Sequence, residues 1–217
     1  MLDKVLSEIL PPLLYKAPAR IRSRMPAPKG AQDVLFDGED GLFKQLAASA
    51  KVYGEYGCGA STLWMASHTA CRIFSVDTSD AWLDIVRQKA AGTGDVTLHH
   101  ADLGAIGAWG RPVGYDSFQN FGDYTDWLWQ QDASPDLVLV DGRFRACCFL
   151  TSLLHANEGA NLVFDDYMDR PHYHFVERFA KPVQTCGRQA WFRAPGQGAL
   201  DVAEVRQAIE RFRFVMD

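Results

Sequence analysis

The sequence predicts an α/β fold built on a doubly wound, mostly parallel sheet that ends in an antiparallel hairpin. From residue 40 onward, short apolar runs typical of strands alternate with segments whose apolar residues recur at helical spacing. The run at 136–140 is apolar on both faces, as a central parallel strand requires. Two short β-rich segments flank Gly187 and Arg188 near the C-terminus, which is the pattern of a hairpin.

The alternation predicts seven strands and six helices. The expected strands cover residues 51–56, 72–76, 96–100, 136–140, 161–164, 183–186 and 190–193. The expected helices cover residues 41–50, 61–67, 79–90, 146–153, 172–179 and 202–212. Thr78 or Ser79 is expected to cap the third helix, and Gly159 falls where a glycine ends the fourth. Ligands of such sheets bind beyond the carboxyl ends of the strands, where the strand order reverses.

The composition predicts one soluble domain spanning residues 1–217. The chain has 47% hydrophobic and 23% charged residues, and its net charge of −5 argues against broad nucleic-acid binding. The N-terminus lacks the basic start and unbroken apolar core of a signal peptide, and no window approaches the length of a transmembrane helix. The five cysteines show no CxxC pair, which disfavours disulfides and zinc. We therefore expect a cytoplasmic protein that does not bind membranes.

Two regions fall outside the alternation. Residues 1–40 are expected to form an N-terminal arm, in which Arg20, Arg22 and Arg24 alternate. Such alternation is typical of a solvated face; substrate capping or contact with a second copy in a homodimer is the alternative. Residues 103–134 form an aromatic-rich insertion, and long connections of this kind are usually functional or partly structured. Its aromatic side chains either line a substrate pocket or form a satellite core, and the satellite core is the preferred interpretation.

A glycine loop between Glu55 and Thr62 carries the strongest functional signal. Gly57 and Gly59 fall at a strand-to-helix turn, where glycine tolerates positive φ and lets a ligand approach the bare backbone. The stretch resembles motif I of the class I S-adenosylmethionine-dependent methyltransferases, with an acidic residue before a G-x-G loop. The resemblance implies a Rossmann-like fold and S-adenosylmethionine as cofactor. It also implies that Gly57 and Gly59 face the methionine part of the cofactor, that Glu55 anchors the loop and the ammonium end, and that Ser61 belongs to this site.

Two further acidic residues follow the next two strands. Asp77 lies 22 positions after Glu55 at the end of the second strand, where a carboxylate can accept both ribose hydroxyls. The alternative for Asp77 is a helix N-cap. By the family resemblance, Asp102 meets the adenine amino group and Leu103 contacts the ring, while a capped turn is the equally open alternative for Asp102.

Three carboxylates end two neighbouring strands. Asp141 follows the strand at 136–140, and the pair Asp165 and Asp166 follows the strand at 161–164. Parallel strands would bring all three to one rim, where oxygen ligands suit Mg²⁺. The spacing resembles that of the catechol-type metal-dependent O-methyltransferases, although Asp166 replaces their asparagine and adds a charge. The alternative is that Asp141 orients the cofactor or substrate without metal, while Asp165 and Asp166 cap a loop.

A cluster of basic side chains lies close to these carboxylates in the sequence. His172 and His174 are candidate bases for a substrate hydroxyl, because imidazole titrates near neutral pH. Arg143, Arg145 and Arg170 are candidates to clamp a carboxylate or phosphate of the substrate. The alternative is a helix start with solvated histidines and arginines.

Taken together, these residues predict S-adenosylmethionine-dependent methyl transfer to a small molecule, with a hydroxyl group as the preferred acceptor. Asp141, His172 and His174 are the candidate catalytic residues. An NAD(P)-dependent oxidoreductase is one alternative, disfavoured because Thr62 stands where the dinucleotide fingerprint has its third glycine. A protein that binds S-adenosylmethionine without catalysis is the other alternative.

Overall fold

The computed structural model describes residues 35–36, 39–196 and 198–217. Most of the predicted N-terminal arm at 1–40, including its three alternating arginines, therefore lies outside the described residues. Of the arm's remaining residues, Leu35 is buried, and its backbone N–H donates to Asp40 Oδ2 at 2.9 Å.

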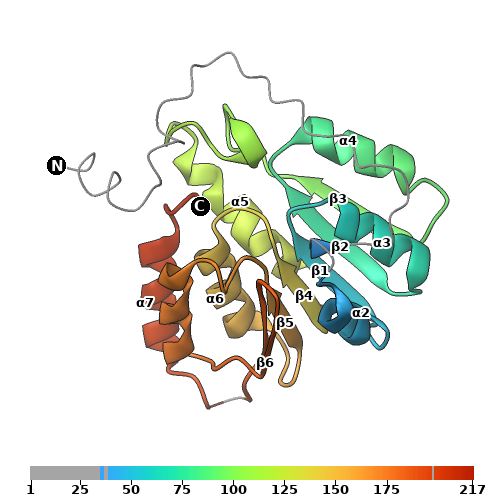
Figure 1. Ribbon diagram of the computed structural model, residues 1–217. Helices are drawn as coiled ribbons and strands as arrows, with labels where there is room; N and C mark the ends of the chain where they lie inside the picture. The colour runs from blue at the N-terminus through green and yellow to red at the C-terminus, as the bar shows by residue number, and fades with distance from the viewer. Residues whose placement is uncertain (1–34, 37–38, 197) are drawn as a thin grey trace. The chain divides into compact units, whose positions relative to one another are not determined.

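The described chain forms one seven-stranded sheet with the strand order β3-β2-β1-β4-β5-β7-β6 (Figure 1). The first five strands are parallel, and β7 runs antiparallel to β5 and pairs with β6. Their bounds are β1 (Val52–Tyr56), β2 (Arg72–Asp77), β3 (Asp95–His100), β4 (Leu137–Val140), β5 (Asn161–Phe164), β6 (Gln184–Cys186) and β7 (Gln189–Arg193). The predicted fold class is confirmed, and the strand order reverses between β1 and β4, where a ligand crevice is expected.

Helices cover both faces of this sheet. In Figure 1, α2 (Gly41–Ala47) and α3 (Ala60–His68) lie on one side, and α6 (Arg145–His155) and α7 (Val202–Phe212) lie on the other. The remaining helical segments are α4 (Asp80–Lys89), α5 (Phe121–Asp126), η2 (Ala108–Gly110), η3 (Phe118–Asn120), η4 (Trp127–Gln130) and η5 (Pro171–Arg178). Within the described part of the chain, every helix is too short or too polar to cross a membrane.

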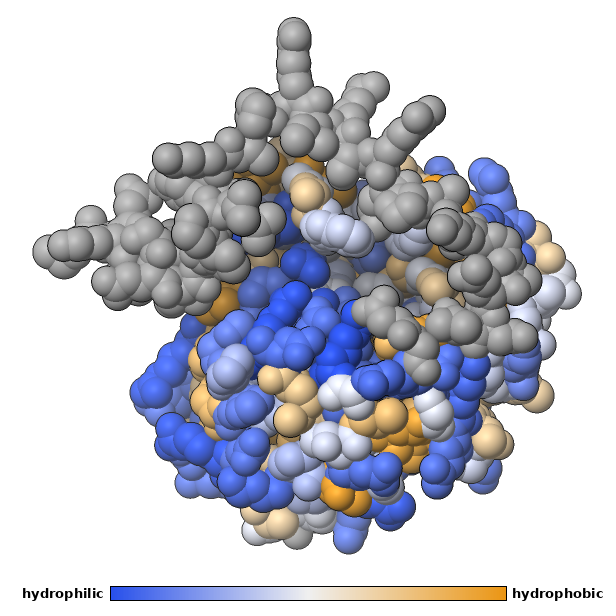
Figure 2. Space-filling model, viewed as in Figure 1, coloured by the Kyte–Doolittle hydropathy of each residue, from blue (hydrophilic) through white to orange (hydrophobic). Residues whose placement is uncertain are grey.

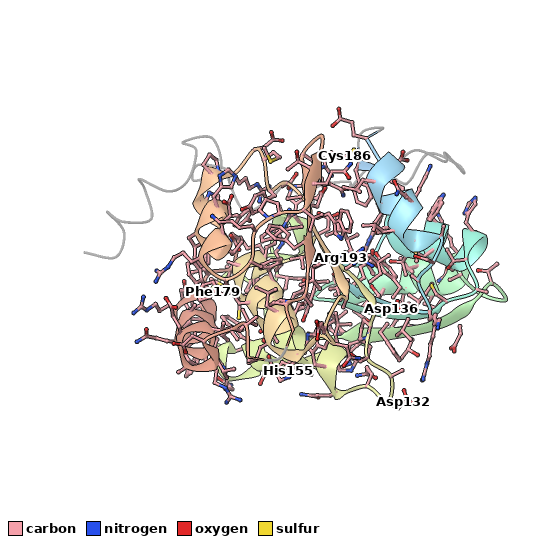
Figure 3. The ribbon with its side chains drawn as sticks, turned by 90° about the horizontal axis from the view of Figure 1, so that it is seen from below. Asp132, Asp136, His155, Phe179, Cys186 and Arg193 are labelled. Carbon is pink, nitrogen blue, oxygen red and sulfur yellow. The ribbon has the colours of Figure 1, made fainter. Side chains whose placement is uncertain are left out.

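Alternating side chains of the central strands build the two largest of three buried clusters. Along β4, Leu139 packs in the cluster that α2 and α3 cover, whereas Val138 and Val140 pack in the larger cluster that α6 and α7 cover. All four β4 residues are buried, which is why the run reads as continuously apolar. At its amino end, Asp136 (labelled in Figure 3) accepts hydrogen bonds from the backbone N–H groups of Lys51 and Val52. This contact joins the beginnings of β1 and β4.

Two details of the helix prediction are wrong. Helix α6 ends at His155 with Ala156 in extended conformation, so Gly159, at φ +81°, belongs to the following turn and does not end the helix. The segment predicted as a helix at 172–179 is the 3₁₀ helix η5, whose hydrogen bonds span three residues, as from Phe179 N–H to Val176 O.

The aromatic insertion contributes to the main core. Phe121 and Tyr124 are buried in the larger cluster, and the Tyr56 hydroxyl donates to Thr125 O at 2.7 Å. The insertion therefore does not form the separate satellite core that was preferred. Trp109 and Phe118 remain 65% and 52% exposed, so only part of its aromatic surface is used in packing.

Candidate functional site

The loop after β1 touches the loop after β4 through two glycines. Gly57 has φ +93° and its N–H donates to Val76 O at 2.8 Å. A Cβ at Gly57 would lie 2.8 Å from Gly142 Cα and 3.0 Å from Gly142 N, so glycine is required there by space as well as by φ. Gly59 is extended, and a Cβ there would lie 3.4 Å from the Trp82 indole nitrogen. The two glycines thus allow the backbone of this loop to pack closely against Gly142 and Trp82, at the point where the strand order reverses.

Glu55 ties this loop to the rest of the sheet. Its side chain is fully buried, and its carboxylate accepts hydrogen bonds from the hydroxyls of Tyr53 and Ser75, each at 2.9 Å. The Ser61 and Thr62 hydroxyls at the start of α3 donate to the same carboxylate. Burial raises the pKa of Glu55. Both oxygens are bonded inside the protein, so the structure places Glu55 and Ser61 beneath the loop, and their contact with a cofactor stays a prediction.

Asp77 ends β2 beside the same loop. Its carboxylate accepts the N–H of Cys58 at 3.0 Å and that of Ser79 at 2.8 Å. Desolvation raises the pKa of Asp77, although these backbone donors and the charge of Arg143 act in the opposite direction. The N-cap of α4 is Ser79, whose hydroxyl accepts the Trp82 N–H at 3.4 Å. The side chain of Asp77 is thus directed at the glycine loop, as a ribose-binding carboxylate must be.

The aromatic insertion reaches the Asp77 end of the site. The Thr78 hydroxyl donates to Gly110 O at 2.6 Å, and a Cβ at Gly110 would lie 3.8 Å from Asp77 Oδ1. Trp109, next to this contact, has φ +60°. The insertion therefore borders the expected ribose position.

The two residues after β3 differ in exposure. Asp102 is exposed and accepts the N–H of Gly104 at 3.0 Å, which is the contact of a capped turn. Leu103 is only 2% exposed and packs in the main core. Contact of either residue with adenine stays a prediction.

The three carboxylates after β4 and β5 do meet. Ligand atoms of Asp141, Asp165 and Asp166 lie within 4.8 Å of one another. Asp165 is fully buried, while the side chains of Asp141 and Asp166 are 29% and 19% exposed. The prediction that neighbouring parallel strands bring them to one rim is confirmed.

Three arginines match the charges of these carboxylates. Buried Arg145, at the start of α6, pairs with Asp141 at 3.2 Å and with Asp166 at 2.9 Å. Its guanidinium also donates to three backbone carbonyl groups, those of Asp141, Gly142 and Asp165. Arg188 contacts both oxygens of Asp165, at 3.0 and 2.7 Å, and Arg170 lies 2.8 Å from Asp166.

This arrangement does not fit a magnesium ion. The Asp165 oxygens are bonded to Arg188 and to the Gln189 amide at 3.0 Å. The guanidinium of Arg145 lies against the other two carboxylates, so a divalent cation would have to displace or oppose buried positive charge. The cluster is electrically balanced by side chains of the protein, and we derive no metal chemistry from it.

Asp141 is the member of the cluster that lies next to the glycine loop. Its N–H donates to Tyr56 O at 3.1 Å, and a Cβ at Gly57 would lie 3.2 Å from its carbonyl carbon. Burial and the neighbouring charge of Asp165 raise the pKa of Asp141 well above its ordinary value, while Arg145 opposes the shift. Asp141 therefore lies beside the glycine loop in surroundings that increase its affinity for a proton.

Backbone strain is concentrated at this edge. Trp109, Phe144 and Asp166 have φ of +60°, +52° and +56°, and they are three of the four non-glycine residues with positive φ in the described chain. Each follows or borders the carboxyl end of a strand. Strained conformations of this kind cluster at functional sites.

The two candidate histidines lie on η5 in different surroundings. The side chain of His172 is 51% exposed, and its Nε2 lies 3.8 Å from Asp217 Oδ2. His174 Nε2 bonds to the backbone O of Tyr167 at 3.2 Å, and its ring stacks on Tyr167 with centroids 4.6 Å apart. A catalytic role for either histidine stays a prediction, and His174 already has structural contacts.

Sequence reasoning missed Arg188 and Gln189. Both were assigned only to the hairpin, yet they reach Asp165 because Ala190 pairs with Phe164 in the antiparallel ladder. Arg188, just before β7, and Gln189, its first residue, therefore lie at the carboxyl end of β5. This register was the signal that could have placed them at the site.

No family profile and no curated protein matches the chain. A solved structure of a methyltransferase-like protein from Silicibacter pomeroyi is 30% identical, covers 82% of this chain and 94% of its own, and superposes with a TM-score of 0.73. A candidate O-methyltransferase from Klebsiella pneumoniae is 18% identical, with 76% and 83% coverage and a TM-score of 0.51.

The first of these relatives shares sequence and architecture across nearly its whole length. The second supports the fold alone. The glycine loop at Gly57, the carboxylate of Asp77 and the strand order of the sheet agree with this relationship. The chain belongs to the class I S-adenosylmethionine-dependent methyltransferase family.

Proposed function

We propose that the protein transfers a methyl group from S-adenosylmethionine to a hydroxyl group of a small molecule, without a metal ion. The observation that carries the proposal is the place of Asp141, whose backbone N–H donates to Tyr56 O beside the glycine loop and whose carboxylate pairs with Arg145 at 3.2 Å. Cofactor binding is assigned to the backbone of Gly57 and Gly59 and to the carboxylate of Asp77.

When bound, S-adenosylmethionine supplies a methyl group already activated for displacement by its sulfonium. The protein then has to align the acceptor and remove the hydroxyl proton. Asp141 would take the hydroxyl proton when the oxygen receives the methyl group, with S-adenosylhomocysteine as the leaving group. Arg145 keeps Asp141 in position through its 3.2 Å ion pair and its bond to the Asp141 carbonyl. Asp141 is proposed as a catalytic residue and Arg145 as a positioning residue.

The charge balance supports chemistry without metal. In metal-dependent transfer the cation lowers the pKa of the acceptor hydroxyl. Here a protein base takes that role, because Arg145, Arg170 and Arg188 already neutralise the three carboxylates.

Transfer of a labelled methyl group from S-adenosylmethionine to a panel of phenols, catechols and hydroxy acids tests the proposal. We expect transfer to at least one hydroxyl compound, unchanged by EDTA and lost in Asp141→Asn, with S-adenosylhomocysteine affinity kept within about threefold. Asp136→Asn, at the opposite end of β4, is the matched control and should change stability but not transfer. Labelling of amines alone, or cofactor binding with no acceptor in the panel, contradicts the hydroxyl assignment.

A further inference from the structure

Arg143 differs from the arginines around it. It follows Gly142 in the loop between β4 and α6, and its Nε is buried without a hydrogen-bond partner among the described residues. Arg145, Arg170 and Arg188 each form an ion pair. The guanidinium of Arg143, in contrast, has no carboxylate within 4 Å among the residues that the structure describes. Desolvation lowers the pKa of Arg143. A buried donor left unpaired is costly, which makes Arg143 a candidate to bind an anion.

Asp217 has a carboxylate oxygen that lacks a hydrogen-bond donor among the described residues. This oxygen, Oδ1, is buried, and the side chain of Asp217 is 19% exposed. The other oxygen lies 3.8 Å from His172 Nε2, and the His172 ring lies against Tyr173 with centroids 4.3 Å apart. The charge of Asp217 also acts on Arg143 and Tyr173. Among the described residues, an unpaired donor in the loop between β4 and α6 and an unpaired acceptor beside η5 are therefore both present at the carboxyl end of the sheet.

We propose that the methyl acceptor is a small hydroxylated acid, whose carboxylate or phosphate is bound by Arg143. A guanidinium presents several N–H donors in a planar fork that matches such anions. This inference rests on the proposed function, since it names the class of acceptor for that site.

The acceptor is the proposed source of the anion. The charge of Arg143 acts on Asp217 and Tyr173, beyond β4 and β5, and also on Asp77 at the end of β2. The carboxylate of the cofactor's methionine part is the competing anion, and the experiment separates the two.

The test follows the Nε–H signal of Arg143 in ¹H–¹⁵N spectra of the full chain, assigned by its loss in Arg143→Gln. The probes are 4-hydroxybenzoate, its methyl ester and inorganic phosphate, each titrated with and without S-adenosylhomocysteine. We expect 4-hydroxybenzoate and phosphate to shift the signal, and the acid to bind at least tenfold more tightly than the ester. Arg143→Gln should remove this preference and leave ester affinity unchanged. Arg178→Gln, which alters an exposed pair with Glu204, should keep it.

Three results would overturn the inference. The first is equal binding of acid and ester to the wild-type chain, a comparison that needs no variant to fold. The second is an Arg143 signal that no anionic probe moves. The third is weaker binding of S-adenosylhomocysteine by Arg143→Gln while 5′-methylthioadenosine, which lacks the carboxylate, binds as before. Lack of methyl transfer with the anion preference intact would instead count against the proposed function.

Discussion

Replacing Gly57 with alanine tests whether the contact between the β1 and β4 loops is as tight as described. Alanine at φ +93° costs about 1–2 kcal/mol in backbone strain. Its Cβ would meet Gly142 Cα at 2.8 Å, whereas carbon atoms pack best at about 3.5–4.0 Å. The obstacle is backbone, so the two loops must separate by roughly 1 Å.

Separation would stretch two hydrogen bonds that join the strands at this point. They run from Gly57 N–H to Val76 O at 2.8 Å and from Asp141 N–H to Tyr56 O at 3.1 Å. Each contributes about 1 kcal/mol. Less freedom in the unfolded chain offsets up to about 1 kcal/mol of the strain. We expect Gly57→Ala to lower the free energy of unfolding by about 3 kcal/mol and to weaken S-adenosylhomocysteine binding at least tenfold.

Gly92→Ala is the matched control. Gly92 has a similar φ of +79°, but no atom of the described residues lies within 4 Å of the position its Cβ would take. Gly92→Ala introduces the backbone strain but no steric clash. We therefore expect the free energy of unfolding to fall by about 1 kcal/mol and the affinity for S-adenosylhomocysteine to be unchanged. Urea unfolding and isothermal titration calorimetry of both variants give the comparison. Equal destabilisation of the two variants, or full affinity in Gly57→Ala, would refute the reasoning.

Three further predictions concern the charged cluster and the buried carboxyl groups. Burial raises the pKa values of Glu55, Asp77 and Asp141, so the folded chain holds protons that the unfolded chain releases. The free energy of unfolding should therefore fall as pH rises from about 4 through these raised pKa values. Asp141→Asn should reduce the slope of the free energy of unfolding against pH, measured by urea unfolding. An unchanged slope would exclude Asp141 as a contributor. Arg145→Leu should cost about 3–5 kcal/mol in the same assay, because it leaves buried carboxylates unpaired, whereas Arg213→Leu at an exposed pair should cost less than about 1 kcal/mol. EDTA treatment followed by Mg²⁺ should leave S-adenosylhomocysteine affinity unchanged, and a Mg²⁺-dependent gain would restore the metal hypothesis.

The fold could be predicted largely from the sequence, because its strands alternate with helices and its central strands are apolar on both faces. The strand Asn161–Phe164 and the helix Val202–Phe212 have the predicted bounds. Gly159 was misplaced because a glycine after an apolar helical face is compatible with either a helix end or a later turn. Only backbone geometry separates the two.

The candidate site could be predicted only in part. Parallel strands explain why Asp141 and Asp165 share a rim, since both positions follow strand ends directly. The arginines that neutralise them were harder to place, because Arg188 reaches Asp165 only through the register of β7 on β5. Arg188 and Asp165 are 23 residues apart, so their pairing leaves no local pattern in the sequence. Without knowledge of that pairing, the three carboxylates were interpreted as a metal site.

Titration of S-adenosylhomocysteine into the wild-type chain and into Asp77→Asn is the most direct test of the central assignment. If Asp77 binds the ribose hydroxyls, the substitution should weaken binding by roughly 30-fold or more, as expected for loss of hydrogen bonds to a charged group. Asp80→Asn, at an exposed carboxylate in the first turn of α4, should bind like the wild type. Equal affinity of Asp77→Asn and wild type, or no binding by the wild-type chain, would contradict the assignment of a nucleoside site to this loop.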